Sequence, residues 1–333
     1  MNHPFELLAP EQRDRLVEEP LPDWLDPMLA TLTDDHFSDP DWVYERKLDG
    51  ERVLAYRSGS DVRLLSRNAT ELDDTYPELH DAIGTASTFT SVLDGEVVAF
   101  EGSLTSFSKL QPRLQISDPE QARASDVAVF FYVFDLLHLD GRSTRDLPLR
   151  TRKSLLRDGV AFDDPLRWVR HRNEDGEAWL EEACRQGWEG LIAKRAAAAY
   201  QHGRSREWLK FKCTARQEFV IGGFTEPEGG RDRFGALLIG YHADGDLRYA
   251  GKVGTGYDQR TLHQLGDQLE QRERRTSPFT DGPQGPGLHF VTPDLVAEIG
   301  FTEWTADGRL RHPRYLGLRE DKDPQDVARE TPD

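Results

Sequence analysis

An unbroken apolar run near the middle of the chain constrains the fold more than any other segment. Val127–Leu137 reads VAVFFYVFDLL, a stretch rich in β-branched and aromatic residues with one charged side chain, Asp135. Such residues favour strands, and a strand without polar alternation is buried on both of its faces. The run therefore predicts a buried central strand.

Shorter strands separated by tight turns are expected on both sides of that run. Asp-Gly and Gly-Ser pairs mark several of the turns. The strands are predicted at Trp42–Lys47, Arg52–Arg57, Val62–Ser66, Ser91–Phe100, Gly190–Lys194 and Glu207–Lys212. Helices are predicted at Tyr76–Ile83, Leu149–Leu156 and Glu177–Gln186, and the last of them is expected to stop at Gly187.

The pattern of predicted elements changes after Thr214. Strands are predicted there at Glu218–Phe224, Ala236–Tyr241, Leu247–Lys252 and Val296–Thr305, with one helix at Asp258–Arg275. Short strands, a single helix and glycine-rich turns are typical of a small barrel of the OB type. Since 333 residues are enough for two domains, we place a boundary near residue 216.

Charge and cysteine content narrow the class of protein. The formal net charge of −18 is unusual for an enzyme that contacts phosphates, but residues 1–46 hold 12 acidic against 3 basic side chains, whereas residues 189–216 are mostly basic. No apolar stretch is long enough to span a membrane, and the start of the chain lacks the pattern of a secretory signal. Cys184 and Cys213 are expected to be separate thiols, with neither a disulfide nor a zinc site, which fits a reducing cytoplasm.

Six charged strings follow one another along the chain and are the candidates for catalytic residues. They are Glu45–Arg52, Leu93–Glu96, Phe134–Leu137, Glu189–Lys194, Trp208–Lys212 and Arg319–Lys322. Within the first string, Lys47 precedes an Asp49-Gly50 turn that would present the lysine at a strand end. A nucleophilic amine, carboxylates and further cations are the groups needed to move a nucleotide onto a lysine.

The chemistry of a lysine nucleophile adds one expectation. An amine attacks phosphorus only when neutral, and its ordinary pKa is about 10.4. Neighbouring cations or a bound metal would lower the pKa of Lys47, and Lys194, Lys210 and Lys212 are the candidate cations. Glu96 and Glu189 are the carboxylates expected near a divalent cation or a sugar.

Each string taken alone also has an ordinary structural interpretation. Lys47 fits a surface hairpin, and Glu96 and Glu189 fit the wet face of an edge strand. Lys210 and Lys212 alternate with apolar residues, which suits a polyphosphate along a sheet or a solvated strand face. Phe134 fits base stacking or the core, and the tail at Arg319, Asp321 and Lys322 fits a solvated surface. The ordered set, not any one string, favours the catalytic interpretation.

As a set, the strings resemble the motifs of the covalent nucleotidyltransferases, and among these the ATP-dependent DNA ligases. The resemblance extends from Pro27 to Val327 and is similar in detail to bacterial ligases of the end-joining type, in a stand-alone form. Further matching strings are Pro27-Met28-Leu29-Ala30, Ser66-Arg67-Asn68, Gly203-Arg204-Ser205 and Leu310-Arg311-His312-Pro313. The resemblance implies an α+β fold: an N-terminal extension at 1–26, a nucleotidyltransferase domain of antiparallel sheets with flanking helices at 27–216, and an OB-fold domain at 217–333.

The resemblance also implies a role for each site residue. Lys47, with Asp49, would become adenylylated by ATP, and AMP would then pass to a DNA 5′-phosphate before a 3′-hydroxyl displaces it. The implied contacts are Glu45 and Phe134 with adenine, Arg52 and Glu96 with the ribose, Glu96 and Glu189 with the metal, Lys194, Lys210 and Lys212 with the phosphates, Arg67 with the DNA, and Arg319, Asp321 and Lys322 with the leaving pyrophosphate.

The implied cofactors are ATP and Mg²⁺, with Mn²⁺ as an alternative. The implied partners are nicked or broken duplex DNA and a Ku-type end-binding protein, with no membrane and a monomeric chain in the cytoplasm. Two rivals stay open: an RNA ligase or GTP-dependent capping enzyme, and a DNA-binding protein without catalysis. Residues 1–26 fit either a solvated helix or a shield for a basic cleft.

Overall fold

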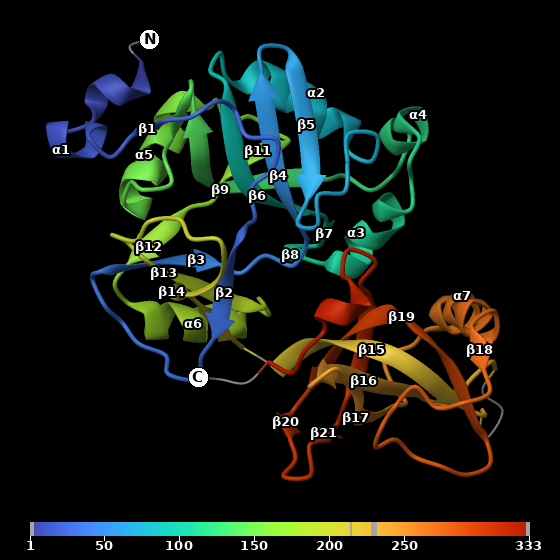
Figure 1. Ribbon diagram of the computed structural model, residues 1–333. Helices are drawn as coiled ribbons and strands as arrows, with labels where there is room; N and C mark the ends of the chain where they lie inside the picture. The colour runs from blue at the N-terminus through green and yellow to red at the C-terminus, as the bar shows by residue number, and fades with distance from the viewer. Residues whose placement is uncertain (1–2, 214, 228–231, 331–333) are drawn as a thin grey trace. The chain divides into compact units, whose positions relative to one another are not determined.

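The computed structural model describes residues 3–213, 215–227 and 232–330, which form two compact units. The first unit runs to Cys213 and the second begins at residue 214. In Figure 1 the first unit takes the colours from blue to yellow-green and the second those from yellow to red. The division lies close to residue 216, where the texture of the sequence changes.

A seven-stranded sheet forms the larger part of the first unit. Its order is β1-β10-β9-β6-β4-β5, and β11 pairs with β9 in parallel while the other pairs are antiparallel. The predicted central strand is confirmed as β9, which is covered on both faces. The strands are β1 (Val17–Glu18), β4 (Glu51–Ser58), β5 (Asp61–Ser66), β6 (Ser91–Val98), β9 (Phe130–Leu139), β10 (Arg142–Ser143) and β11 (Leu166–Trp168).

Helices cover one face of this sheet because their apolar residues recur at helical spacing. Leu79 and Ile83 of α2 and Leu155 and Leu156 of α5 are buried in one cluster with Val53, Leu93 and Phe131 of the sheet. The helices are α2 (Pro77–Ala86), α3 (Phe107–Leu114), α4 (Pro119–Arg123) and α5 (Leu149–Gly159), and a small hairpin of β7 (Phe100–Glu101) and β8 (Leu104–Thr105) precedes α3. The helices predicted near residues 76 and 149 are thus confirmed.

A five-stranded sheet completes the first unit. Its order is β12-β3-β13-β14-β2, and all pairs are antiparallel except β14 with β2. Helix α6 (Gly176–Arg185) packs on one of its faces through Trp179, Leu180 and Ala183. The strands are β2 (Met28–Leu32), β3 (Trp42–Arg46), β12 (His171–Asn173), β13 (Gly190–Arg195) and β14 (Gly203–Lys212).

The expectation of two separate thiols is wrong. Cys184, in the last turn of α6, is bonded to Cys213, which directly follows β14, and their Cα atoms lie 5.2 Å apart. The main-chain N–H of Cys213 also donates to the carbonyl of Glu189. The packing of α6 against the five-stranded sheet brings together two residues that 29 positions separate in the sequence.

The N-terminal residues belong to the first unit and do not form a separate extension. After η1 (Pro4–Leu7) and α1 (Pro10–Arg13), β1 pairs with β10 at the edge of the seven-stranded sheet. Leu8 is part of the main core cluster, and Glu19 forms an ion pair with Arg145 at 2.7 Å. The acidic start of the chain is therefore packed against the sheet.

The described residues of the second unit contain a six-stranded antiparallel half-barrel sheet, a two-stranded sheet and an α-helix, in agreement with the predicted OB-type fold. The sheet order is β17-β16-β15-β19-β18, with β22 paired to β19. Phe219 and Ile221 point into a core shared with Leu262 and Leu265 of the helix. The elements are β15 (Ala215–Thr225), β16 (Leu237–Ala243), β17 (Asp246–Val253), α7 (Gln259–Glu270), β18 (Glu273–Arg274), β19 (Leu288–Phe301), β20 (Glu303–Trp304), β21 (Leu310–Arg311), β22 (Arg314–Leu318) and η2 (Pro324–Asp326).

The helix of the second unit is shorter than the sequence predicts. Asp258 caps its start by accepting from the N–H of Thr261 at 2.7 Å, but the helix ends at Glu270. Glu273 and Arg274 instead pair with β19, because the edge of that sheet offers their main-chain groups partners. Among the described residues, no helix combines the length and apolarity that crossing a membrane requires.

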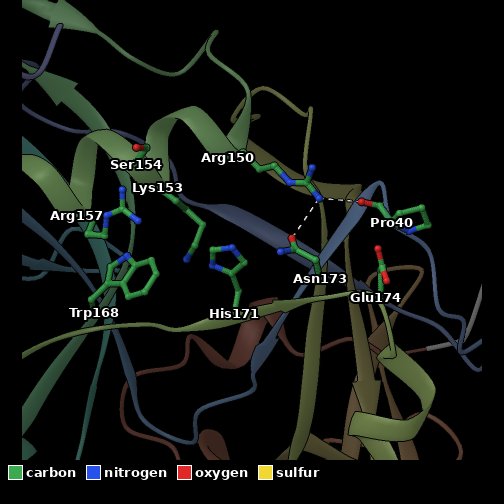
Figure 2. A pocket seen from close by; sticks show the side chains of 9 residues that line it. All are labelled: Pro40, Arg150, Lys153, Ser154, Arg157, Trp168, His171, Asn173 and Glu174. Carbon is green, nitrogen blue, oxygen red and sulfur yellow. Dashed lines mark hydrogen bonds between the residues drawn. The ribbon is translucent and has the colours of Figure 1, made fainter. Parts of the chain in front are cut away.

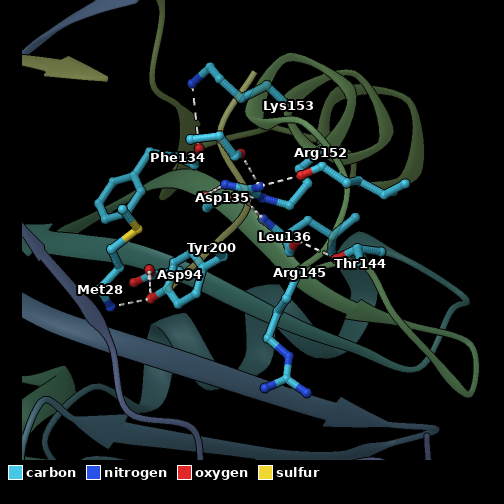
Figure 3. A network of polar contacts seen from close by, with 12 residues as sticks. Met28, Asp94, Phe134, Asp135, Leu136, Thr144, Arg145, Arg152, Lys153 and Tyr200 are labelled. Carbon is cyan, nitrogen blue, oxygen red and sulfur yellow. Dashed lines mark hydrogen bonds and ion pairs between the residues drawn. The ribbon is translucent and has the colours of Figure 1, made fainter. Parts of the chain in front are cut away.

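A fully buried ion pair attaches α5 to the central strand. Arg152 donates to both carboxylate oxygens of Asp135, at 2.7 and 2.8 Å, and also to the carbonyls of Leu147 and Ala198 (Figure 3). Neither side chain is exposed. Because an unpaired charge is costly in such a place, the pair fixes α5 against β9.

Asp135→Asn is expected to lower the free energy of unfolding by about 3–5 kcal/mol, because it leaves Arg152 charged and buried without its carboxylate. Urea unfolding followed by tryptophan fluorescence measures this, since of the 7 tryptophans only Trp304 belongs to the second unit. Glu182→Gln, which removes a surface partner of Arg172, is the control and should cost below about 1 kcal/mol. Equal losses in the two variants would contradict the assignment.

Candidate functional site

The five-stranded sheet presents one apolar and one polar face. Tyr44, Leu191, Ala193, Leu209 and Phe211 point to the α6 side. Because side chains alternate along a strand, the intervening residues share the opposite face. They are Glu45 and Lys47 from the β3 segment, Lys194 from β13, and Lys210 and Lys212 from β14. Five of the predicted site residues thus lie on one surface.

This polar face packs against the seven-stranded sheet. Met28 and Trp208 of the smaller sheet share a buried cluster with Leu54, Val92 and Phe134 of the larger one. Arg52 and Asp94, on the same side of the larger sheet, lie beside Met28, whose carbonyl accepts from Arg52 at 3.3 Å. The predicted residues from the two sheets therefore meet in one interior.

Lys47 is held by the segment that precedes β13. Its Nζ lies 2.6 Å from Oε2 of Glu189, and its main-chain N–H donates to the carbonyl of Gly190 at 2.9 Å. A Cβ at Gly190 would lie 2.0 Å from the carbonyl oxygen of Phe211, so this close approach requires glycine. The side chain of Lys47 keeps 21% exposure.

Carboxylates, not cations, control the pKa of Lys47 in the structure. Burial acts to lower that pKa, but the nearby Glu189 carboxylate raises it above its ordinary value, with smaller contributions from Glu96 and Asp49. The expectation that neighbouring lysines lower it is therefore wrong for this arrangement. Lys47 is a charged partner of Glu189, and attack on phosphorus requires that this pair open.

Glu45 lies at the other end of the polar face, two residues before Lys47. Its two oxygens are bound by different lysines, Oε1 by Lys153 at 2.5 Å and Oε2 by Lys194 at 2.6 Å. All three side chains are almost completely buried. Burial and the charge of Lys153 lower the pKa of Lys194 to about 8, although Glu45 opposes this.

Phe134 borders the same end of the face. The Nζ of Lys194 lies 4.0 Å from the centroid of the Phe134 ring and 4.0 Å from that of Trp208. The guanidinium of Arg52 lies 4.6 Å from the Phe134 centroid. The structure thus places Glu45 and Phe134, the residues predicted to contact adenine, around Lys194. Lys194 therefore lies at the Glu45 end of the polar face.

Arg52 belongs to a buried network with two residues that the sequence did not single out. It donates to both oxygens of Asp94, at 2.5 and 2.7 Å. Tyr200 donates to Oδ2 of Asp94 at 2.7 Å (Figure 3). The hydroxyl of Tyr200 also accepts from the main-chain N–H of Met28. Glu96 lies directly opposite Arg52 on β6 and adds to its electrostatic environment.

The carboxylates present can hold a divalent cation. Glu189 and, more weakly, Glu96 both act on the pKa of Lys47. The described residues contain no cluster of three or more metal-binding side chains. A pair of carboxylates fits Mg²⁺, which binds one or two of them and keeps water or phosphate oxygens as its other ligands.

The remaining predicted residues are Arg67 in the first unit and Arg319, Asp321 and Lys322 in the second. Arg67 is half-buried in the turn after β5. In the second unit, Arg319 donates to both oxygens of Asp321 at 2.8 Å, and Lys322 lies 3.6 Å from Glu218. Arg319 and Asp321 are nearly buried, and Arg319 lowers the pKa of Asp321 against the effect of burial, so they are not a solvated tail.

Asp94, Tyr200 and Lys153 were missed at the sequence level. A carboxylate inside the apolar strand Ser91–Val98 was a usable signal for Asp94, because a buried charge implies a partner. Lys153 carries no such signal, since a lysine on an amphipathic helix resembles a surface lysine.

Glu189→Gln is expected to lower the pKa of Lys47, because it removes the carboxylate that raises it and leaves the effect of burial. Acetylation of Lys47, measured by peptide mass spectrometry across pH, should then reach its half-maximal rate at lower pH than in the unmodified protein. Glu96→Gln should shift the profile in the same direction by less, and exposed Lys109 serves as the internal reference. An unmoved Lys47 profile would contradict the Lys47–Glu189 pair.

Comparison with known proteins identifies the family of this chain. A family model described as ATP dependent DNA ligase domain matches residues 27–212, and one described as ATP dependent DNA ligase C terminal region matches residues 230–322. The solved structure of a mycobacterial DNA ligase D complexed with ATP and MES has a TM-score of 0.66 and 35% identity, and the match covers 92% of this chain and 98% of that one.

Curated relatives extend the comparison. The chain is 36% identical over 322 residues to the multifunctional non-homologous end joining protein LigD of Pseudomonas aeruginosa. This match covers 94% of this chain and 37% of the relative. It is 38% identical over 327 residues to the LigD end joining DNA repair protein of Mycobacterium tuberculosis, with coverage of 96% and 41%. The chain thus spans about two fifths of the length of these relatives, and by its match to the family models it belongs to the ATP-dependent DNA ligase family.

Proposed function

We propose that this chain seals breaks between a 5′-phosphate and a 3′-hydroxyl in duplex DNA, through a covalent Lys47–AMP intermediate and adenylylated DNA. The observation that carries the proposal is the position of Lys47. Its amine lies 2.6 Å from Glu189 on the sheet face that also bears Lys210 and Lys212. Family membership supplies the nucleotide, ATP, and the class of acceptor.

The first step joins the Nζ of Lys47 to the α-phosphorus of ATP and breaks the bond to pyrophosphate. Lys47 must lose its proton before it attacks, so its ion pair with Glu189 has to open in this step. Glu96 and Glu189 would hold Mg²⁺ or Mn²⁺, which neutralises phosphate charge and competes with Lys47 for the Glu189 carboxylate. Asp49, whose Oδ2 accepts from the N–H of Phe107, fixes the turn that follows Lys47.

The other residues of the interior orient the nucleotide. We assign Glu45 and Phe134 to the adenine and Arg52 with Glu96 to the ribose. Lys210 and Lys212 are assigned to the phosphates, together with Lys194 once it leaves Glu45. The fixed geometry of these groups is what converts an encounter with ATP into an aligned displacement.

The second unit is assigned to the first step, and Arg67 to the transfer onto DNA. Arg319, Asp321 and Lys322 are assigned to the departing pyrophosphate, and Arg67 to the 5′-phosphate side of the DNA break. In the second step AMP moves from Lys47 to that 5′-phosphate. In the third, the 3′-hydroxyl attacks the adenylylated phosphate and AMP leaves.

The end joining context of the relatives supports DNA breaks as the biological substrate and a Ku-type protein as the recruiting partner. We propose that the chain acts as a monomer in the cytoplasm. The Cys184–Cys213 bond would be unusual in that compartment, because a reducing cytoplasm keeps most cysteines as thiols.

Incubation with α-phosphate-labelled ATP and Mg²⁺ is expected to label the protein, and the label should survive denaturation. Lys47→Ala should abolish labelling because it removes the attacking amine, whereas Lys109→Ala, which removes an exposed lysine of α3, should label normally. Nicked DNA should chase the label into sealed product. Labelling by GTP in place of ATP would favour the capping-enzyme alternative, and no labelling by either nucleotide would overturn the proposal.

Lys322→Ala is expected to reduce labelling by ATP at least about tenfold, as the loss of one charged contact to a leaving group implies. Sealing of a nick that already carries a 5′-adenylate should be retained, because that step releases AMP and not pyrophosphate. Lys252→Ala, an exposed lysine of β17 in the same unit, is the matched control. Equal losses of both reactions would contradict the assignment of Lys322 to pyrophosphate.

A further inference from the structure

Lys153 is the one lysine of α5, and its side chain points into the protein. It stands on the helix face that borders a cavity of about 520 Å³, together with Arg150 and Arg157 (Figure 2). Those two arginines have partners at the surface: Arg150 donates to Pro40 and Asn173, and Arg157 to Asp158. Lys153 alone passes beside Trp168 and His171 to the interior, where it is 2% exposed.

The ammonium of Lys153 has three acceptors, one for each of its N–H groups. They are Oε1 of Glu45 at 2.5 Å, the carbonyl of Val169 at 3.1 Å and the carbonyl of Phe134 at 3.5 Å. Two of these acceptors belong to the residues assigned to adenine. One cation therefore fixes both the carboxylate of Glu45 and the main chain that carries the Phe134 ring.

The two lysines that bind Glu45 are not equivalent. Lys194 has no acceptor among the described residues comparable to the two carbonyls that hold Lys153, and its ammonium lies over Phe134 and Trp208. Burial and the charge of Lys153 also lower the pKa of Lys194 to about 8. When Lys194 turns to the phosphates, Lys153 is left as the partner of Glu45.

We propose that Lys153 is a positioning residue for nucleotide choice: it holds Glu45 ionised and oriented so that the free oxygen accepts from a base amino group. The inference rests on the proposed adenylyl transfer. An ionised carboxylate is an acceptor only. It suits adenine, which carries an amino donor at N6, and opposes guanine, which carries an acceptor at O6.

Loss of Lys153 changes what Glu45 can offer. Burial raises the pKa of Glu45, and the charges of Lys153 and Lys194 more than offset this. Without Lys153 the carboxyl takes up a proton more readily, and a protonated carboxyl can donate to O6 of guanine. The variant should therefore accept GTP better as well as ATP less well.

Lys153→Met tests this, with Lys153→Gln as a second variant that keeps hydrogen-bond donors without the charge. The rate of lysine labelling by ATP and by GTP is measured over a range of nucleotide concentration. The expected result is a rise in KM for ATP with a smaller change in kcat, and an ATP-over-GTP ratio of kcat/KM lowered at least about tenfold, the scale of one lost charge-assisted hydrogen bond. Arg157→Met removes a cation of the same helix and cavity and should leave the ratio unchanged.

The double variant Lys153→Met with Glu45→Gln separates positioning from a general effect on folding. If Lys153 acts through Glu45, then Lys153→Met should not lower the ratio further once Glu45 is an amide. A ratio that falls equally in both backgrounds, or that stays at its original value in Lys153→Met and Lys153→Gln, overturns the proposal. Unmodified protein that labels with neither nucleotide overturns the proposed function itself, so the two failures are distinguishable.

Discussion

Every carboxylate buried between the two sheets of the first unit needs a cation, and this requirement organises the site. Asp94 meets Arg52 and Glu45 meets two lysines, while Glu189 meets Lys47. An isolated buried charge is too costly to keep, so each pair fixes the strands that contribute its members. The same ion pairs that define the interior thus hold the reactive groups in place.

The period of a strand explains how one short segment serves two tasks. Glu45 and Lys47 are two residues apart, so both project from the same face of β3. Their partners lie on different elements: α5 and β13 for Glu45, and the segment before β13 for Lys47. The residue assigned to the base and the proposed nucleophile therefore lie close together, while each has its own ion-pair partners.

The strands and most helices were predictable because apolar periodicity is a local property. The alternation of Lys210 and Lys212 with Leu209 and Phe211 gave the polar face of β14 directly. Contacts between distant segments were not predictable from single residues. The Lys153–Glu45 pair joins positions 108 apart, and the Cys184–Cys213 bond depends on how α6 packs against the smaller sheet. Packing of the sheets decides such partners, and no local pattern records it.

Residues that precede the range matched by the family model are part of the folded first unit. The match to the family model begins at residue 27, but Leu8 lies in the core and β1 forms the edge of the seven-stranded sheet. The N–H of Leu25 also donates to the hydroxyl of Tyr56 at 2.9 Å. A protein trimmed to the recognisable range would bare an unpaired strand edge, the kind of surface on which chains aggregate. The packed first unit thus extends beyond the range that the family model matches.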